Sequence, residues 1–353
     1  MKNLEKYLTL LNGEADGLLL TSCYSRHYGA EFDISEGVAI VTKAGCRYFT
    51  DSRYIESAEN NLKGFEVICV DKIGYIKLIN NAIADFGVST LGFEEDYLTV
   101  AEFRHYEENL NAKLIPMHKE ISGFRSTKED WELDLMRKAQ AITDKAFAEV
   151  LPRLKVGMTE LELQAELIYC LYKNGATGLA FDPIVVSGPN TSMPHGVAGE
   201  RVITEGDFVT MDFGASYMGY CADMTRTVAV GFATEEMKKV YHTVLEAQLA
   251  GLAISKAGVP GKDIDGAARK VITDAGYGEY FGHGYGHSLG LQVHESPSPN
   301  GRNEKPMPVG AVASAEPGIY LPGKFGVRIE DVVIFREDGC ENITASPKNL
   351  IIV

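Results

Sequence analysis

Four acidic residues interrupt apolar, strand-like segments in the second half of the chain: Asp212, Asp223, Glu316 and Glu330. Burying a carboxylate without a compensating charge costs several kcal/mol, on the order of the stability of a whole domain. A fold that buries these segments therefore has to bring the acids together around a cation or a shared proton. Each acid belongs to a segment that flanks a turn, so strand pairing decides where it points.

The first pair of acids lies in a predicted hairpin. Residues 209–213 and 220–230 are typical of strands, and the glycine-containing segment 214–219 between them is typical of a turn. A turn centred between Tyr217 and Met218 places Asp212 opposite Asp223 in an antiparallel pair. Opposed residues lie on one face with Cβ atoms roughly 4.5–5.5 Å apart. Two carboxylates at that separation repel each other unless a cation or proton lies between them.

The second pair repeats this arrangement near the C-terminus. Residues 313–320 approach the turn at Pro322-Gly323-Lys324, and residues 326–335 leave it. Centring the turn on Gly323 places Glu316 opposite Glu330, and Arg328 lies on the same strand face as Glu330. A cation in that position is suited to orient a ligating carboxylate. One such pair could be solvated at a sheet edge, whereas two in one domain favour a metal site.

A glycine-rich segment, 282–297, contains three of the eight histidines of the chain, His283, His287 and His294. Its glycine spacing lacks the third glycine of a dinucleotide-binding loop, and Pro297 opposes a zincin helix. We expect a strand in which His294 points away from the apolar face, and a functional site rather than three core histidines. A fourth histidine, His195, lies in a predicted loop, and its position alone leaves a solvated side chain and a functional one equally open.

Composition narrows the possible partners. The 353-residue chain has a net charge of -15, which disfavours nucleic acid and anionic membranes as partners. No apolar run of ~18 residues is present, so we expect neither a signal peptide nor a membrane span. The six cysteines form no Cys-x-x-Cys pair, which favours reduced thiols in a cytoplasmic protein.

The order of predicted elements indicates two domains, residues 1–123 and 124–353, and an α+β fold overall. The first domain is predicted to be a compact α/β unit with a mixed sheet, with strands near 17–20, 37–41, 47–50 and 65–70 and helices at 53–62, 73–86 and 99–110. In the second, Ser126-Thr127-Lys128-Glu129 is interpreted as a capping box that opens a helix extending to about residue 153. A second helix is expected from Thr159 to Gly175, and further helices at 235–257 and 263–275.

Taken in order, these segments resemble the pita-bread metallopeptidases, specifically Xaa-Pro aminopeptidases and Xaa-Pro dipeptidases (prolidases). The similarity covers nearly the whole chain. In the N-terminal domain, which resembles the creatinase type, its clearest sign is Thr50-Asp51-Ser52-Arg53-Tyr54. In the C-terminal domain it is carried by segments 181–190, 194–196, 212–215, 223–227, 283–294, 316–320 and 327–331.

The resemblance implies a role for each candidate residue. Asp212 would bind one metal ion, His287 and Glu316 the other, and Asp223 and Glu330 would bridge the two. A hydroxide between the metals would attack the scissile carbonyl, with Glu316 as the acid/base that shuttles the proton. His195 and His294 would orient the substrate and stabilise the tetrahedral intermediate, and His283 and Arg328 would complete the surroundings of the substrate.

The implied cofactor is a pair of divalent ions, of which Mn²⁺ suits one nitrogen among oxygen ligands best, with Co²⁺, Fe²⁺ and Zn²⁺ as alternatives. The implied substrate is a peptide or dipeptide with proline second, and the implied assembly a homodimer. Ala222 and 313–315 differ from the family pattern and are expected to affect the shape of the pocket. A non-prolyl hydrolase on the same scaffold, creatinase-like or another aminopeptidase, and a non-catalytic binding homologue remain as alternatives, and aminopeptidase and dipeptidase activity are both open.

Overall fold

The computed structural model describes residues 2–353, which fall into two compact units divided between Arg125 and Ser126. The sequence placed the domain boundary near residue 123. All six cysteines are free thiols. Within residues 2–353, no helix combines the length and the apolar character that crossing a membrane requires.

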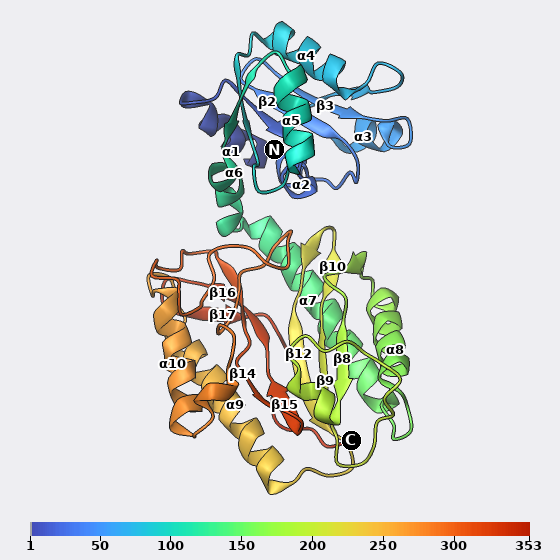
Figure 1. Ribbon diagram of the computed structural model, residues 1–353, viewed down its shortest axis with the longest axis vertical. Coiled ribbons are helices and arrows are strands. Elements are labelled where there is room, and N and C mark those ends of the chain that lie inside the picture. The colour runs from blue at the N-terminus through green and yellow to red at the C-terminus, as the bar shows by residue number, and fades with distance from the viewer. Residues whose placement is uncertain (1) are drawn as a thin grey trace. The chain divides into compact units, whose positions relative to one another are not determined.

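The N-terminal unit is built on one six-stranded sheet with the order β4-β3-β2-β1-β5-β6. The sheet is mixed, as predicted, because β1 pairs antiparallel with β2 and parallel with β5. Its strands are β1 Gly17–Leu20, β2 Val38–Thr42, β3 Cys46–Thr50, β4 Glu66–Cys69, β5 Thr90–Phe93 and β6 Lys113–Pro116. Its helices are α1 Lys2–Thr9, α2 Cys23–Ala30, α3 Ile55–Asn61, α4 Tyr75–Phe86, α5 Val100–Asn109 and α6 His118–Gly123 (Figure 1).

Burial of the central strand β1 explains why this sheet needs helices on both faces. All four residues of β1 are buried, which is the pattern of a strand covered on both sides. On one face, Ile79 and Ile83 of α4 join Phe49 and Leu91 in a common apolar core. The sequence did not predict β5 and β6, which are only four residues long, and β6 is exposed at both ends.

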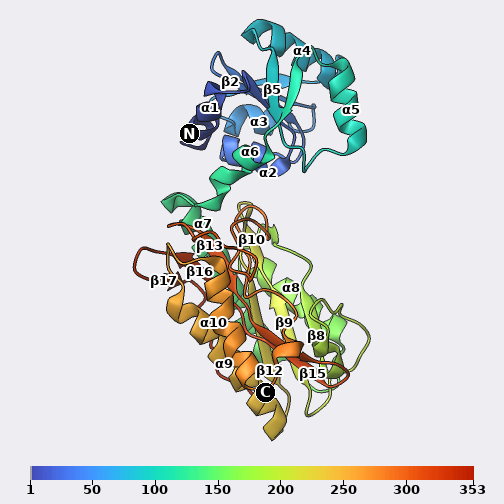
Figure 2. The same ribbon diagram turned by 60° about the vertical axis from the view of Figure 1, so that its left-hand side comes forward.

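The C-terminal unit consists of two halves, each a group of strands backed by a pair of long helices (Figure 1). In the first half, α7 Asp130–Val150 and α8 Glu160–Lys173 accompany β7 Gly178–Leu179, β8 Ile184–Ser187, β9 Phe208–Phe213, β10 Ala215–Tyr217, β11 Tyr220–Cys221 and β12 Met224–Ala229. In the second half, α9 Glu235–Ile254 and α10 Gly261–Asp274 accompany β13 Val312–Ala315, β14 Gly318–Leu321, β15 Phe325–Arg328, β16 Asp331–Phe335 and β17 Cys340–Asn342. The turned view shows α9 and α10 side by side (Figure 2).

Helix α7 follows the predicted apolar periodicity but begins later than predicted. The six residues expected on its apolar face are all buried: Leu133, Met136, Ala139, Ile142, Ala146 and Val150. The predicted capping box at Ser126 was wrong, because Ser126 belongs to a short 3₁₀ turn. Glu129 is the N-cap instead, and Glu132 completes a capping box, because its carboxylate accepts a hydrogen bond of 2.9 Å from the backbone N–H of Glu129.

The predicted register of the first hairpin was wrong by two residues. Asp212 pairs with Thr225 rather than with Asp223. The turn lies at Met218-Gly219, where both residues have positive φ, 50° and 82°, as a two-residue hairpin turn of this type requires. Asp223 therefore falls in a break between β11 and β12. Gly214 faces this break, and a Cβ there would lie 1.8 Å from the carbonyl oxygen of Ala222.

The predicted register of the second hairpin is confirmed. Gly318 pairs with Arg328 in β14/β15, and Ala315 pairs with Asp331 in β13/β16. Both ladders agree with a turn centred on Gly323. Glu316 and Glu330 lie in the gap between the two ladders, in the register that places them opposite each other. Asp223, Glu316 and Glu330 thus lie where a ladder is interrupted, whereas Asp212 lies within the ladder of β9.

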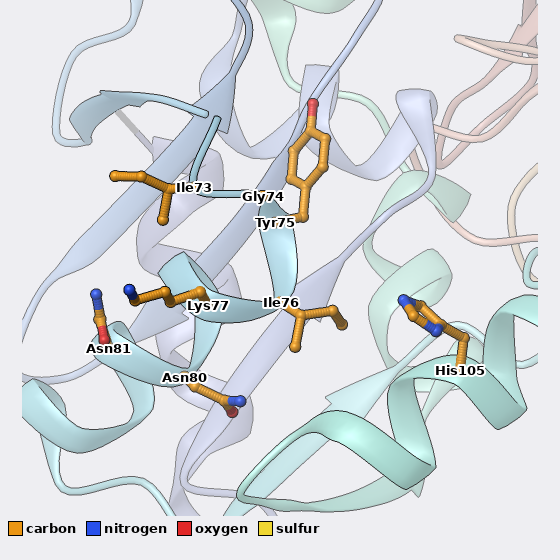
Figure 3. Close-up of a pocket in the computed structure, with 8 residues that line it drawn as sticks. All are labelled: Ile73, Gly74, Tyr75, Ile76, Lys77, Asn80, Asn81 and His105. Atoms are coloured by element: carbon orange, nitrogen blue, oxygen red, sulfur yellow. The ribbon is translucent and has the colours of Figure 1, made fainter. Parts of the chain in front are cut away.

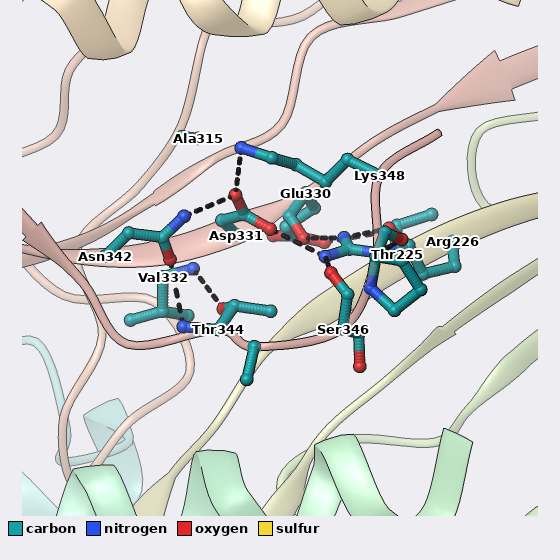
Figure 4. Close-up of polar contacts among 12 residues, drawn as sticks. Thr225, Arg226, Ala315, Glu330, Asp331, Val332, Asn342, Thr344, Ser346 and Lys348 are labelled. Carbon is teal, nitrogen blue, oxygen red and sulfur yellow. Dashed lines mark hydrogen bonds and ion pairs between the residues drawn. The ribbon is translucent and has the colours of Figure 1, made fainter. Parts of the chain in front are cut away.

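The two halves are joined along β12 and the β15–β16 segment. The backbone N–H of Glu330 donates to the carbonyl of Thr225 over 3.1 Å. Arg226, which is 1% exposed, donates to the carbonyl of Glu330 and to Asp331 Oδ1, the latter over 2.8 Å (Figure 4). Asp331 also accepts from Lys348 at 2.8 Å. Burial raises the pKa of Asp331, but the charges of Arg226 and Lys348 outweigh this effect and hold the pKa below its ordinary value.

Removing the carboxylate of Asp331 should destabilise the C-terminal unit strongly. Asp331→Ala leaves the Arg226 guanidinium buried without its counter-charge, a change that costs about 3–5 kcal/mol. The matched control is Asp134→Ala. The side chain of Asp134 is 74% exposed and pairs with Arg137, so its removal is expected to cost less than about 1 kcal/mol. Urea unfolding followed by circular dichroism measures both. Equal, small effects of the two substitutions would contradict the structural role of the Arg226–Asp331 pair.

Candidate metal centre and active site

A pocket of about 430 Å³ in the C-terminal unit contains every residue that the sequence singled out. Strands and irregular segments from both halves of the unit contribute to its wall. The candidate residues that line it are His195, Asp212, Asp223, His283, His287, His294, Glu316, Arg328 and Glu330. The fold therefore brings together residues that are up to 135 positions apart in the chain.

The floor of the pocket holds buried carboxylate oxygens without partners. Within residues 2–353, Asp212 Oδ1, Asp223 Oδ1 and Glu330 Oε1 are buried and accept no hydrogen bond. The other oxygens of two of these acids are held in place: Asp212 Oδ2 accepts from Arg328 over 2.5 Å, and Glu330 Oε2 accepts from Thr225 Oγ1 over 2.7 Å. Asp212 and Glu330 thus each have one oxygen held by a donor and one oxygen available.

Burial and mutual repulsion raise the pKa of this group. The pKa of Asp223 lies well above its ordinary value because the carboxyl is desolvated and faces Asp212 and Glu316. The pKa of Glu330 is likewise raised well above its usual range, first by burial and then by Asp223. Burial also raises the pKa of Glu316, against the opposing effect of His283. Such a cluster favours bound protons or a bound cation.

His287 presents a ring nitrogen to the same point. Its Nδ1 lies 3.2 Å from the carbonyl oxygen of Ser288, so that Nδ1–H donates to this carbonyl. Its Nε2 then carries the lone pair and lies 3.5 Å from Asp223 Oδ2 and 3.3 Å from Glu316 Oε1. Burial lowers the pKa of His287, which favours the neutral ring that binds metals. A backbone carbonyl on the second nitrogen is the usual support of a metal-binding histidine.

This donor set fits divalent metal ions. One ligand atom from each of Asp223, His287 and Glu330 lies within 4.8 Å of the others. Ligands of one ion bound at about 2.1 Å lie roughly 3 Å apart, comparable with the distances from His287 Nε2 to its carboxylate neighbours. The unpartnered oxygens of Asp212, Asp223 and Glu330 add the acceptors that a hard cation requires.

Ser314 and Gly286 fix the approach of the histidine segment to Glu316. The Ser314 hydroxyl donates to Glu316 Oε1 over 3.0 Å and accepts from the backbone N–H of His287 over 3.0 Å. A Cβ at position 286 would lie 2.0 Å from the carbonyl oxygen of Ser314, so only glycine allows this approach. The expectation of a strand in this segment was wrong: Ser288 makes only isolated bridges, to Glu295 and Ala313.

Arg328 connects Asp212 to one histidine of the pocket. Its Nη1 donates to the Tyr320 hydroxyl over 2.8 Å, and this hydroxyl lies 2.8 Å from His283 Nε2. His283 Nδ1 lies 2.9 Å from the carbonyl oxygen of Gly284. The geometry is consistent with a chain of donors that runs from Arg328 through Tyr320 to His283 and on to this carbonyl. All of the side-chain nitrogens of Arg328 contact protein acceptors, so its position suits orientation of Asp212.

The two remaining histidines lie at the opening of the pocket. Both side chains are exposed. The ring centroid of His294 is 4.4 Å from that of His287, and His195 lies in the loop between Ser187 and Gly199. Glu160, which is fully buried, holds both ends of this loop. Its carboxylate accepts from the backbone N–H of Ser187 over 2.7 Å and from that of Gly199 over 3.1 Å.

Sequence reasoning did not assign Thr225, Tyr320 or Glu160 to the site, and it noted Ser314 only within the segment 313–315, which was expected to affect the shape of the pocket. Thr225 and Tyr320 lie in hairpin strands, and the predicted alternation of those strands could have placed them on the same faces as Asp223 and Arg328. Glu160 was noted only as part of a helix start. Its role depends on a contact with a loop that follows 27 residues later, for which no local pattern exists.

A second hollow, of about 550 Å³, lies in the N-terminal unit between the start of α4 and α5. Figure 3 shows its lining side chains, among them Lys77, Asn80 and His105. The residues that line it include no carboxylate. Among residues 2–353, the group of metal-binding side chains that lies close enough to hold an ion is Asp223, His287 and Glu330 in the pocket of the C-terminal unit.

Known proteins share this sequence and this architecture. The chain is 40% identical to the uncharacterized peptidase YqhT of Bacillus subtilis, over 96% of each protein. Among solved structures, an Xaa-Pro dipeptidase from Bacillus anthracis has a TM-score of 0.96 and 42% identity, covering 100% of this chain and 99% of that one. An X-Pro aminopeptidase from Thermotoga maritima has a TM-score of 0.93 and 38% identity, covering 99% of both chains.

Two family descriptions match the two units. Residues 3–127 match the creatinase/prolidase N-terminal domain, and residues 134–337 match metallopeptidase family M24. The second match includes all nine candidate residues that line the pocket. With its pita-bread catalytic unit and the preceding mixed-sheet unit, the chain belongs to metallopeptidase family M24.

Proposed function

We propose that this protein hydrolyses the peptide bond between an N-terminal residue and proline, using two divalent metal ions. The observation that carries the proposal is the convergence of three unpartnered, buried carboxylate oxygens with the free Nε2 of His287. The proposed ligands are Asp212, Asp223, His287, Glu316 and Glu330. The names of similar structures, an Xaa-Pro dipeptidase and an X-Pro aminopeptidase, support the choice of substrate.

The protein's own groups would divide the work of the reaction. Two divalent cations in this pocket would act as Lewis acids toward the scissile carbonyl and lower the pKa of a shared water. Glu316, whose pKa burial raises, is suited to accept a proton at Oε1 and return it to the leaving nitrogen. His195 and His294 lie at the opening, where ring N–H groups could orient the carbonyl and stabilise developing negative charge.

Proline explains why a dedicated pocket is needed. The bond before proline is a tertiary amide without an N–H, so a protease that binds this donor cannot hold it. The proposed site would hold such a bond through the side chains that line the pocket. Both a dipeptide and a longer peptide remain compatible with this proposal.

We further propose Mn²⁺ as the preferred ion, because the ligand set contains one nitrogen among oxygens. Co²⁺, Fe²⁺ and Zn²⁺ are the alternatives. The proposal includes a homodimer in solution, an assembly suggested by the family resemblance. Analytical ultracentrifugation distinguishes a dimer from a monomer directly.

Substituting one of the bridging acids should abolish hydrolysis. Asp223→Asn removes a carboxylate that would bind the proposed ions, and kcat/KM for Ala-Pro and Ala-Pro-Ala with added Mn²⁺ is expected to fall by more than about 100-fold, since even residues that only support a ligand contribute 10–100-fold. Asp338→Asn, at an exposed position outside the pocket, is the matched control. Full activity of the Asp223 variant would show that the ligand assignment is wrong. Cleavage of Ala-Ala-Ala at the rate of Ala-Pro-Ala would contradict the proline specificity.

Metal binding should stabilise the folded protein in a pH-dependent manner. At a Mn²⁺ concentration of 100 times the Kd, the expected gain is about 2.7 kcal/mol. The gain should be smaller at pH 5.5 than at pH 7.5, because the carboxyls of Asp223 and Glu330, whose pKa values burial raises, must lose protons before they bind metal. Differential scanning calorimetry with and without Mn²⁺ measures the shift in Tm. An equal shift in Asp223→Asn would indicate binding elsewhere.

A further inference from the structure

One wall of the pocket is formed by a bulge next to Asp212. In β8/β9, Ile184 pairs with Asp212. In β7/β10, Leu179 pairs with Ala215, and the N–H of Ala180 donates to the carbonyl of Gly214 over 2.9 Å. Residues 181–183 therefore stand opposite Phe213 alone. Bulges of this kind turn side chains out of the sheet and are frequent beside active sites.

The bulge carries an acid that takes no part in the ligand cluster. Asp182 lines the pocket together with Phe181 and Ile184. It is exposed, and within residues 2–353 no hydrogen bond or ion pair joins it to another residue. The other carboxylates among the lining residues are the proposed metal ligands. Arg328, the only lysine or arginine of the pocket lining, is committed to Asp212, Thr225, Tyr320 and the carbonyl of Pro194.

The position of Asp182 determines which positively charged group of a peptide could reach it, the α-amino group or a side chain. The α-amino group of an N-terminal residue lies directly beside the scissile carbonyl, so catalysis keeps it at the ligand cluster. Asp182 lies in the bulge beyond Ile184, which itself stands opposite Asp212. A cation at the end of a long side chain can extend to it. Phe181 and Ile184, both half-buried, offer apolar surface for the methylene stem of such a side chain.

We propose that Asp182 is a specificity-determining residue that favours substrates whose N-terminal residue is lysine or arginine. This inference rests on the proposed function, since it concerns the residue before proline in the same pocket. Because Asp182 is exposed, the preference is modest, about two- to fivefold, as for ion pairs at protein surfaces. It decreases with ionic strength, because salt screens exposed charges.

The test compares three peptides that differ in one side chain: Lys-Pro-Ala, norleucine-Pro-Ala and Glu-Pro-Ala. Norleucine has the linear stem of lysine without its charge. The ratios of kcat/KM are measured for the Mn²⁺-loaded wild type, Asp182→Asn and Asp182→Lys, at about 20 mM and about 500 mM salt. Glu200→Gln removes the same charge at an exposed position of the same unit that does not line the pocket, and serves as the matched control.

We expect the wild type to prefer lysine over norleucine about two- to fivefold at low salt and less at high salt. The ratio of the lysine to the norleucine peptide should fall to about one in Asp182→Asn. In Asp182→Lys, the glutamate peptide should be preferred over the lysine peptide. Glu200→Gln should keep the wild-type ratios. An unchanged ratio in both Asp182 variants overturns the inference, and so does an equal loss for all three peptides, which would assign Asp182 to the α-amino group or to the fold. If the wild type cleaves none of the peptides, the proposed function fails and this inference with it.

Discussion

Repulsion among four carboxylates in one buried pocket is the constraint on which the structure of the catalytic unit depends. Only Asp212 contacts a guanidinium directly, at 2.5 Å from Arg328. The hydroxyl groups of Ser314 and Thr225 hold Glu316 and Glu330. Asp223 and Glu330 each keep a buried oxygen without a partner. A polypeptide that retains such an arrangement needs a rigid surrounding and a cation to complete it. Because the chain belongs to a metallopeptidase family, metal binding explains why these carboxylates are kept together.

The rigid surrounding comes from the seam between the two halves of the unit. Arg226 binds the carbonyls on either side of the seam as well as Asp331, and Thr225 holds the carboxylate of Glu330. Three of the acids, Asp223, Glu316 and Glu330, lie where the strand ladders are interrupted. Interruption releases backbone from regular pairing, so the side chains can turn toward a common point that a continuous ladder would not allow. The helices behind each half keep the ladders on both sides of the gap in place.

Much of this arrangement could be predicted from the sequence, because local signals determine it. Gly323 marks the centre of the second turn, and the register of both adjoining ladders follows from it. The first turn was misplaced, because it is formed by Met218 and Gly219, and nothing in the sequence requires a methionine to adopt positive φ. The same limit applies to Ser126, which has the composition of a helix cap but lies in a 3₁₀ turn.

The sequence predicted those residues of the candidate site whose side chains can bind a metal ion or transfer a proton. All nine candidates line one pocket, whereas the residues that hold them, such as Glu160 and Tyr320, were not recognised. Their function consists of contacts between distant segments, and such contacts depend on tertiary packing. The irregular course of the histidine segment was missed for a similar reason, since its conformation is imposed by the close approach of Gly286 to Ser314.

The bulge at residues 181–183 separates the proposed recognition of the substrate by Asp182 from the proposed binding of metal by Asp212, although both residues line one wall of the pocket. The pairing of Ile184 with Asp212 and of Leu179 with Ala215 holds the strand on both sides of the bulge. The exposed side chain of Asp182 can therefore be exchanged without shifting the strand that carries Asp212, whereas Pro183 is buried and its carbonyl accepts from Gln164. Such a position gives a lineage of enzymes freedom to change what it accepts while the reaction centre stays the same.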